Sequence, residues 1–357
     1  MTTSTTPAID SARAEAFQGR LGSLLNDSFL ALLISVGHRT GLFDRMCELP
    51  PSSSETIARA AGLHERYVRE WLAAMVTGRI VDYDGARRTY QLPAEHARLL
   101  TRAAKGDNLA VITQIVGELG KVEDDIVHCF RAGGGVPYER YHRFHELQAE
   151  LTAPVFDATL IDAVLPMTGM LDALRAGISV LDVGCGLGRS TLLMARAFPA
   201  SRFCGLDLCA DPVLRARRAA AEAGLTNVSF ERGDAAELAA PARFELVTAF
   251  DVIHDQARPA EGLAGIRAAL RPGGTFLCVD IAASSNLADN LDHPLAPMLY
   301  ASSTLHCTAV SLAQGGAGLG SMWGQELALK MLAEAGFRDV AVQKLDGDVF
   351  NNYYIAR

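Results

Sequence analysis

The sequence predicts an α/β fold in which a largely parallel β-sheet follows a mostly helical N-terminal region. Three observations support this prediction. From Ile178 onward, short apolar runs rich in β-branched residues alternate with segments of helical length. The first of these runs ends in a glycine-rich turn at 184–188, and a helix-like segment follows the turn directly. Before residue 178 the apolar residues recur mainly at helical spacing.

Composition and charge exclude several classes of protein. The length of 357 residues suits two domains, and 49% hydrophobic residues are enough for a sizeable core. The net charge of −8 argues against a general binder of polyanions. The seven cysteines include no Cys-x-x-Cys pair, which indicates unpaired thiols in a reducing compartment. The early apolar run 29–36 is too short to span a bilayer. We therefore expect a soluble, cytoplasmic protein with no membrane partner.

The first 105 residues have the pattern of a winged helix. Apolar residues recur at helical spacing over 21–46, and a capping serine cluster then precedes a short helix at 55–61. A second helix is expected at 64–77. Asp84-Gly85 follows between two alternating runs, which is a hairpin signal. We expect residues 1–105 to form a winged-helix domain, and its apolar first helix to need a partner from another subunit.

Charge decides whether this winged helix binds DNA. Residues 1–105 carry 13 Lys/Arg and 11 Asp/Glu, a net charge of only +2. In the second helix Glu65 and Glu70 offset Arg66 and Arg69, whereas phosphate binding needs several uncompensated cations. The pair Arg87-Arg88 is the only basic cluster. We expect a role in dimerisation or in capping a substrate, with DNA binding as the alternative.

Residues 106–176 are expected to bridge the two domains. A helix is predicted at 107–131, the glycines 133–135 interrupt it, and a helical stretch follows at 141–176. This stretch contains side chains that can bind metals: His142, His145, Glu146 and Glu150. No third ligand lies in register with any pair of them, so we predict no metal site.

From residue 178 the alternation is regular, and the last domain is taken as 177–357. Strands are expected at 178–183, 202–207, 228–230, 244–250, 275–281, 340–342 and 353–355. Helices are expected at 190–198, 211–223, 260–270 and 325–335, and Arg271-Pro272-Gly273-Gly274 is expected to turn before the fifth strand. Strands that alternate with helices in this way form a parallel sheet.

Ligands of such sheets bind beyond the carboxyl ends of the strands. Asp207 ends the second strand, 19 residues after Gly188, close to the spacing at which an acid reaches ribose hydroxyls. The alternative is that Asp207 only caps the next helix. Asp234 follows the third strand, and we expect it either to contact the nucleobase of a ligand or to belong to an ordinary turn. The glycine turn is Gly-x-Gly-x-Gly rather than the dinucleotide pattern Gly-x-Gly-x-x-Gly.

These motifs together resemble the class I S-adenosylmethionine-dependent methyltransferases: Asp182-Val183-Gly184-Cys185-Gly186-Leu187-Gly188, Gly205-Leu206-Asp207, Gly233-Asp234-Ala235 and Leu270-Arg271-Pro272-Gly273-Gly274. The resemblance covers about Val180 to Arg357. It implies a Rossmann-like sheet of seven strands, the last of them antiparallel, and S-adenosylmethionine as cofactor. The positions implied for cofactor binding are Asp182, Gly184, Cys185, Gly186, Gly188, Asp207, Leu208, Gly233, Asp234, Ala235 and Phe250.

The whole chain resembles bacterial small-molecule methyltransferases that dimerise through an N-terminal winged helix. The stretch Ala-Phe-Asp-Val-Ile-His254-Asp255 is similar to the Leu-His-Asp-Trp stretch of winged-helix O-methyltransferases, although Gln256 stands in place of the Trp. The resemblance implies that His254 is the general base, and we expect Asp255 to orient it. A histidine with a pKa near 6.5 suits proton transfer from a hydroxyl at neutral pH. The alternative is that His254 only caps its loop.

The resemblance leads to a functional expectation: methyl transfer to a small molecule, with a hydroxyl the expected acceptor, by a homodimer that binds no nucleic acid. Two alternatives remain. One is a DNA-binding regulator with a ligand-sensing domain, and the other is an N- or C-methyltransferase that needs no histidine base. We expect the insertion 282–321 to set specificity, either as a mobile lid or as a plain surface loop. The candidate substrate-binding residues are His145, Met298, His306 and Trp323.

Overall fold

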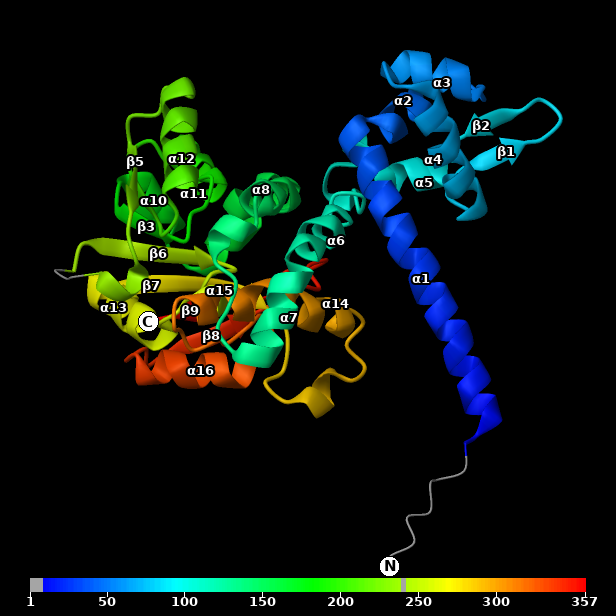
Figure 1. Cartoon of the computed structure of the whole chain (residues 1–357). Coiled ribbons are helices and arrows are strands. Elements are labelled where there is room, and N and C mark those ends of the chain that lie inside the picture. The colour runs from blue at the N-terminus through cyan, green and yellow to red at the C-terminus, as the bar shows by residue number, and fades with distance from the viewer. Residues whose placement is uncertain (1–8, 239–241) are drawn as a thin grey trace, which may run out of the picture. The chain divides into compact units, whose positions relative to one another are not determined.

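The computed structural model describes residues 9–238 and 242–357 (Figure 1). The chain packs as two compact units, Met1–Gly117 and Glu118–Arg357. Each unit is described by itself.

The first unit is a winged helix, as predicted. Its elements are α1 (Ser11–Thr40), α2 (Leu42–Glu48), α3 (Ser54–Ala61), α4 (Glu65–Thr77), β1 (Asp82–Asp84), β2 (Thr89–Gln91) and α5 (Ala94–Leu100). Strands β1 and β2 form the antiparallel wing. Trp71 of α4 packs edge-on against Phe43 of α2, and its Nε1 donates a hydrogen bond of 2.8 Å to the Leu33 carbonyl. These contacts give the small domain a core of its own.

Helix α1 differs from the prediction at both ends. It begins ten residues earlier than expected, because the Asp10 side chain caps it by accepting a hydrogen bond from the Arg13 amide. It ends at Gly41, whose φ of 72° breaks the predicted 21–46 helix in two. By length and composition α1 could cross a membrane, since its most apolar 18-residue window has a mean hydropathy of 1.3. A core helix of a globular protein and an N-terminal signal sequence pass the same test.

The predicted helix at 107–131 is wrong, because this stretch is broken. A 3-10 turn (Arg102–Asp107) ends where the stretch begins, and helix α6 (Gln114–Leu119), a second 3-10 turn (Gly120–Val122) and helix α7 (Glu123–Ala132) follow. Gly117 and Gly120 have low helix propensity, which favours a break here. The helical stretch predicted at 141–176 consists of α8 (Phe144–Val155), a π-helix (Phe156–Val164), α9 (Leu165–Met167) and α10 (Leu171–Ala176).

The second unit contains a seven-stranded sheet in the order β5-β4-β3-β6-β7-β9-β8. The strands are β3 (Ser179–Val183), β4 (Arg202–Asp207), β5 (Val228–Arg232), β6 (Phe244–Phe250), β7 (Leu270–Ile281), β8 (Val340–Gln343) and β9 (Asn351–Ala356). Strand β9 is antiparallel to both β7 and β8, as expected. The turn expected at 271–274 lies within β7 as an irregularity of the pairing: Phe244 of β6 pairs with Leu270 and Leu246 pairs with Thr275, so the register shifts across residues 271–274.

Helices cover both faces of the sheet (Figure 1). The helices are α11 (Arg189–Ala197), α12 (Ala210–Glu222), α13 (Pro259–Ala269), α14 (Ala296–Ser302), α15 (Thr308–Ala313) and α16 (Gly324–Glu334). One core lies between the sheet and α13 and α16, and another lies under α11. The predicted Rossmann-like, seven-stranded fold is confirmed, and the carboxyl ends of β3 to β7 form the edge where a ligand would bind.

Candidate active site

The glycine turn after β3 is built from three residues in the left-handed region. Gly184, Gly186 and Gly188 have φ angles of 66°, 51° and 79°. A Cβ on Gly184 would lie 2.3 Å from Val252, and one on Gly188 would lie 2.7 Å from Phe230. A Cβ on Gly186 would have no neighbour within 4 Å. The first and third glycines are therefore required by packing, whereas the second leaves open space for a ligand.

Asp182 holds this turn from below. Its carboxylate accepts hydrogen bonds from Ser190 and Thr191 of α11, both at 2.6 Å, and from Thr248 of β6 at 2.8 Å. The side chain is 1% exposed, and its burial raises its pKa despite these three hydroxyls. The resemblance places Asp182 among the cofactor-binding positions, but in this geometry both of its carboxylate oxygens accept hydrogen bonds from hydroxyls of the chain. Its carboxylate positions the turn instead.

Asp207, at the end of β4, also braces the turn. It accepts hydrogen bonds of 2.8 Å from the amides of Gly186, in the glycine turn, and of Cys209, the residue just before α12. Each carboxylate oxygen still has a lone pair for a hydroxyl. His145 of α8 lies next to it, because one possible metal-ligating atom each from His145, Asp207 and Cys209 lies within 4.8 Å of the others. Leu208 is 39% exposed beside this group.

The other predicted cofactor residues line the same edge. Cys185 is buried within the turn, and burial raises the pKa of its thiol. Phe250 packs edge-on against Phe156, with ring centroids 5.0 Å apart. Ala235 is buried in the core. Asp234 caps the short turn after β5 and pairs with Arg258 at 2.8 Å.

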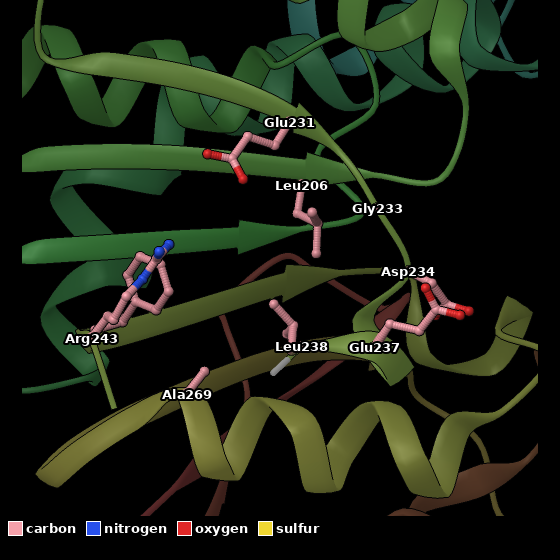
Figure 2. A pocket seen from close by; sticks show the side chains of 9 residues that line it. Leu206, Glu231, Gly233, Asp234, Glu237, Leu238, Arg243 and Ala269 are labelled. Carbon is pink, nitrogen blue, oxygen red and sulfur yellow. The ribbon is translucent and has the colours of Figure 1, made fainter. Parts of the chain in front are cut away.

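A cavity of about 290 Å³ lies on the α13 face of the sheet (Figure 2). Leu206 and Leu238 lie at its centre, Asp234 and Glu237 at one end, and Arg243 at the other. Only Gly233 and Asp234 of the predicted cofactor residues line it, and neither the glycine turn nor His254 does. This cavity therefore lies apart from the predicted catalytic residues.

His254 lies after β6 and is 4% exposed. Its Nδ1 is 2.6 Å from an oxygen of Asp280 at the end of β7, so Nε2 is the nitrogen left to act. The same Asp280 oxygen accepts hydrogen bonds from the Ile281 amide at 2.8 Å and from Trp323 Nε1 at 3.1 Å. Burial lowers the pKa of His254, but the carboxylates of Asp280 and Asp255 raise it more, and the net pKa lies well above its usual range.

Asp280 was missed by the sequence analysis, which gave the orienting role to Asp255. In the structure Asp255 is on the other side of the ring, with one oxygen 3.3 Å from His254 Nε2. The missed signal was position: Asp280 is an acid at the carboxyl end of the fifth predicted strand, directly comparable with Asp207. A second acid at this edge, Asp251, has a φ of 54° and a buried oxygen without a partner.

The candidate substrate residues do not form one group. His306 is 1% exposed, stacks on Phe144 with ring centroids 3.5 Å apart, and lies 3.7 Å from Asp255. Trp323 is buried and holds Asp280, so it supports the site from behind. Met298 packs on a separate small cluster of the insertion. The insertion itself is largely helical, and the Ser311 hydroxyl and the Ala317 amide bond to the carbonyls of residues 256 and 257.

Two family models match the chain. Residues 28–102 match a winged helix-turn-helix domain described as Rv2258c-like, and residues 174–336 match a methyltransferase domain. The predicted combination of these two domains is thus confirmed.

Curated relatives match over part of the chain. A nocamycin O-methyltransferase from Saccharothrix syringae is 42% identical over 103 residues, which are 27% of this chain and 36% of the relative. A fatty-acid O-methyltransferase from Mycolicibacterium smegmatis is 38% identical over 105 residues, 29% of this chain and 37% of the relative. The chain thus matches little more than a third of the length of these relatives.

The fold agrees with solved structures over nearly the whole chain. Human N-acetylserotonin methyltransferase in complex with S-adenosylmethionine has a TM-score of 0.67 at 18% identity, with 99% of each chain covered. The mitomycin 7-O-methyltransferase MmcR has a TM-score of 0.68 at 19% identity, covering 98% of this chain and all of that one. At this identity the likeness shows the fold.

Proposed function

We propose that this chain, which joins a winged-helix domain to a class I methyltransferase domain, transfers a methyl group from S-adenosylmethionine to a hydroxyl oxygen of a small molecule. The observation that carries the proposal is the buried pair of His254 and Asp280 at the carboxyl edge of the sheet. A histidine held at one nitrogen by a carboxylate is arranged to accept a proton at the other.

The residues around the glycine turn fit the cofactor. Gly186 leaves open space at the turn, and Asp207 lies beside it with lone pairs available for ribose hydroxyls. We assign the methionyl end of the cofactor to the backbone of residues 184–188, and its nucleobase to the neighbourhood of Asp234 and Phe250. S-adenosylmethionine, when bound, supplies a sulfonium methyl group that is already activated for attack.

His254 then has one chemical task. Its Nε2 accepts the proton of the acceptor hydroxyl while the oxygen attacks, and Asp280 at Nδ1 stabilises the imidazolium that forms. The acceptor must compete with Asp255 for Nε2, because an oxygen of Asp255 lies 3.3 Å from it. The burial of His254 keeps water away from the reacting oxygen.

The experiment that tests this function starts with the full chain, labelled methyl donor and a metabolite extract, followed by identification of the labelled product. With that acceptor, His254→Ala should lower kcat by about 10²- to 10⁴-fold. Calorimetry should show unchanged donor binding by the variant. The matched control is His128→Ala, since His128 is an exposed residue of α7 outside both the insertion and the candidate site. Undiminished turnover by His254→Ala would exclude His254 as the general base. A product with the labelled methyl group on nitrogen or carbon would support an N- or C-methyltransferase.

We also propose that the protein is a homodimer through α1. Seven apolar side chains follow one stripe of this helix and are at least 39% exposed: Phe17, Leu21, Leu24, Leu25, Phe29, Leu32 and Val36. Such a stripe favours pairing with the same helix of a second copy. Light scattering should give twice 38.1 kDa for the wild type, and Leu25→Glu should give the monomer mass. The control Asn26→Glu, beside the stripe, should stay dimeric. A monomeric wild type would contradict the proposal.

The second candidate function is a DNA-binding regulator, which the match of residues 28–102 to a winged helix-turn-helix domain favours. Against it, the arginines of α4 are paired: Arg66 with Glu70, and Arg69 with Glu65. A gel shift at low salt that Arg87→Ala together with Arg88→Ala abolishes would support this function, and absence of any shift would exclude it.

A further inference from the structure

Two pairs of neighbouring residues meet at the carboxyl edge of the sheet. His254 and Asp255 lie on the 3-10 turn Ile253–Asp255, and His306 and Cys307 lie on the π-helical turn Ser303–Cys307. One possible ligating atom each from His254, Asp255 and Cys307 lies within 4.8 Å of the others. We propose that these three residues, with His306 as the fourth, bind a divalent metal ion of the zinc class.

The spacing of these atoms is close to that of a zinc site. Tetrahedral ligands at the usual zinc distances lie roughly 3.3–3.7 Å from one another. His254 Nε2 and one Asp255 oxygen are 3.3 Å apart, and His306 Nδ1 and the other oxygen are 3.7 Å apart. Imidazole, thiolate and carboxylate are also the ligand types that zinc selects.

Unpartnered polar atoms point to a ligand in the same place. Asp255 Oδ1, the oxygen that lies 3.3 Å from His254 Nε2, and both ring nitrogens of His306 are buried and form no hydrogen bond in the described part of the chain. The His306 side chain is only 1% exposed, so solvent does not take the place of a partner. Leaving such groups without hydrogen bonds costs free energy, and a metal ion would bind Asp255 and one of the two His306 nitrogens directly.

The charges around the cluster favour a cation. Asp251, Asp255 and Asp280 lie around His254, and no lysine or arginine pairs with any of them among residues 9–238 and 242–357. Buried carboxylates in proteins are paired with cations or coordinate metals.

Asp280 supplies the outer support that metal-binding histidines usually have. It holds Nδ1 of His254 at 2.6 Å and is itself held by Trp323, which leaves Nε2 directed away from the carboxylate. The second His-Asp-Cys group, His145 with Asp207 and Cys209, is a weaker candidate. Both oxygens of Asp207 already accept backbone hydrogen bonds, whereas Asp255 Oδ1 accepts none.

The site goes beyond the proposed methyl transfer and is tested without it. Nε2 of His254 cannot bind a metal and accept a proton at once, so the metal-loaded and base-competent forms exclude each other. Cobalt(II) titration of the full chain, stripped with a chelator, reads out the site by its thiolate-to-cobalt absorption band. We expect one equivalent of Co²⁺ to produce the band and Zn²⁺ to abolish it.

Variants assign the ligands. Cys307→Ser should remove the band and weaken Zn²⁺ binding at least tenfold, and His306→Ala, with its fold checked by circular dichroism, should weaken binding as a second probe. The control Cys47→Ser, at an exposed cysteine outside the unit, should change nothing. No band at stoichiometric Co²⁺ would overturn the proposal. So would a band that persists in Cys307→Ser and disappears in Cys209→Ser, because the metal would then lie at the His145 group. Donor binding, measured separately, tests the methyltransferase proposal alone.

Discussion

Replacing Gly184 by alanine tests how the glycine turn is built. Alanine at a φ of 66° costs about 1–2 kcal/mol for the left-handed backbone alone. Its Cβ would also lie 2.3 and 2.5 Å from the two γ-carbons of Val252. Because the branched valine side chain is stiff, the overlap costs roughly a further 1–3 kcal/mol. The free energy of unfolding should therefore fall by about 2–5 kcal/mol.

Gly186→Ala is the matched control. It has the same backbone penalty at a φ of 51°, but its Cβ has no neighbour within 4 Å. The free energy of unfolding should fall by only about 1–2 kcal/mol. The open space next to Gly186 is where we place the methyl donor, so this variant should lose donor affinity while it stays folded.

The assay is urea unfolding of both variants, of Val252→Ala and of Gly184→Ala with Val252→Ala, together with calorimetric titration of the methyl donor. The double-mutant cycle isolates the overlap, and we expect a favourable coupling of about 1–3 kcal/mol between positions 184 and 252. Equal destabilisation by the two glycine variants, or a coupling near zero, would refute this account of the turn.

Two further predictions concern titratable groups. The rate of methyl transfer should rise with pH and reach half of its maximum above pH 6.5, because the base acts only when it is deprotonated. Burial lowers the pKa of His254, but the carboxylates of Asp280 and Asp255 raise it more. A pH profile of kcat centred at or below 6.5 would contradict this. Burial raises the pKa of Asp251 to about 7, so the native state loses stability as pH rises from about 4 through 7. Asp251→Asn should remove this loss and raise the free energy of unfolding by at most about 4 kcal/mol at pH 8. If the melting temperatures of wild type and variant changed in parallel across pH 4–8, this prediction would be excluded.

Local patterns were enough to predict most of the fold. The strands of the sheet are short apolar runs, and the strand expected at 244–250 has the bounds of β6 in the structure. Gly41 lies within the apolar pattern of residues 21–46. A glycine can continue a helix or end it, and the left-handed φ of Gly41 ends α1 here. The break at 120–122 depends on how the chain packs, which helical spacing alone does not reveal.

The candidate site was less predictable, because its residues are distant in sequence. Asp280 is 26 residues after His254, and His306 is 52 residues after it. Only the parallel pairing of β6 and β7 brings the ends of these strands together. The π-helical turn that presents His306 and Cys307 has no sequence signal of its own. The sequence could therefore suggest His254 as a candidate base, but it did not reveal the contact with Asp280.

The acids of the site differ in what occupies their oxygens, and this difference predicts two kinds of mutant. Ser190, Thr191 and Thr248 all donate to Asp182, whereas Asp255 keeps an oxygen without a partner. Asp182→Asn turns one acceptor oxygen into a donor and should lower the free energy of unfolding by about 1.5–3 kcal/mol for each hydroxyl bond lost.

Asp255→Asn removes one of three neighbouring acids, which relieves the repulsion that raises the pKa of Asp251, while Asp280 still holds the His254 ring, so its free energy of unfolding should be unchanged or higher. It should nevertheless lose cobalt binding. Urea unfolding and the cobalt band measure the two effects independently. If Asp255→Asn were the less stable of the two variants, its carboxylate would be a structural group, and the argument that its unpartnered oxygen is available to a ligand would fail.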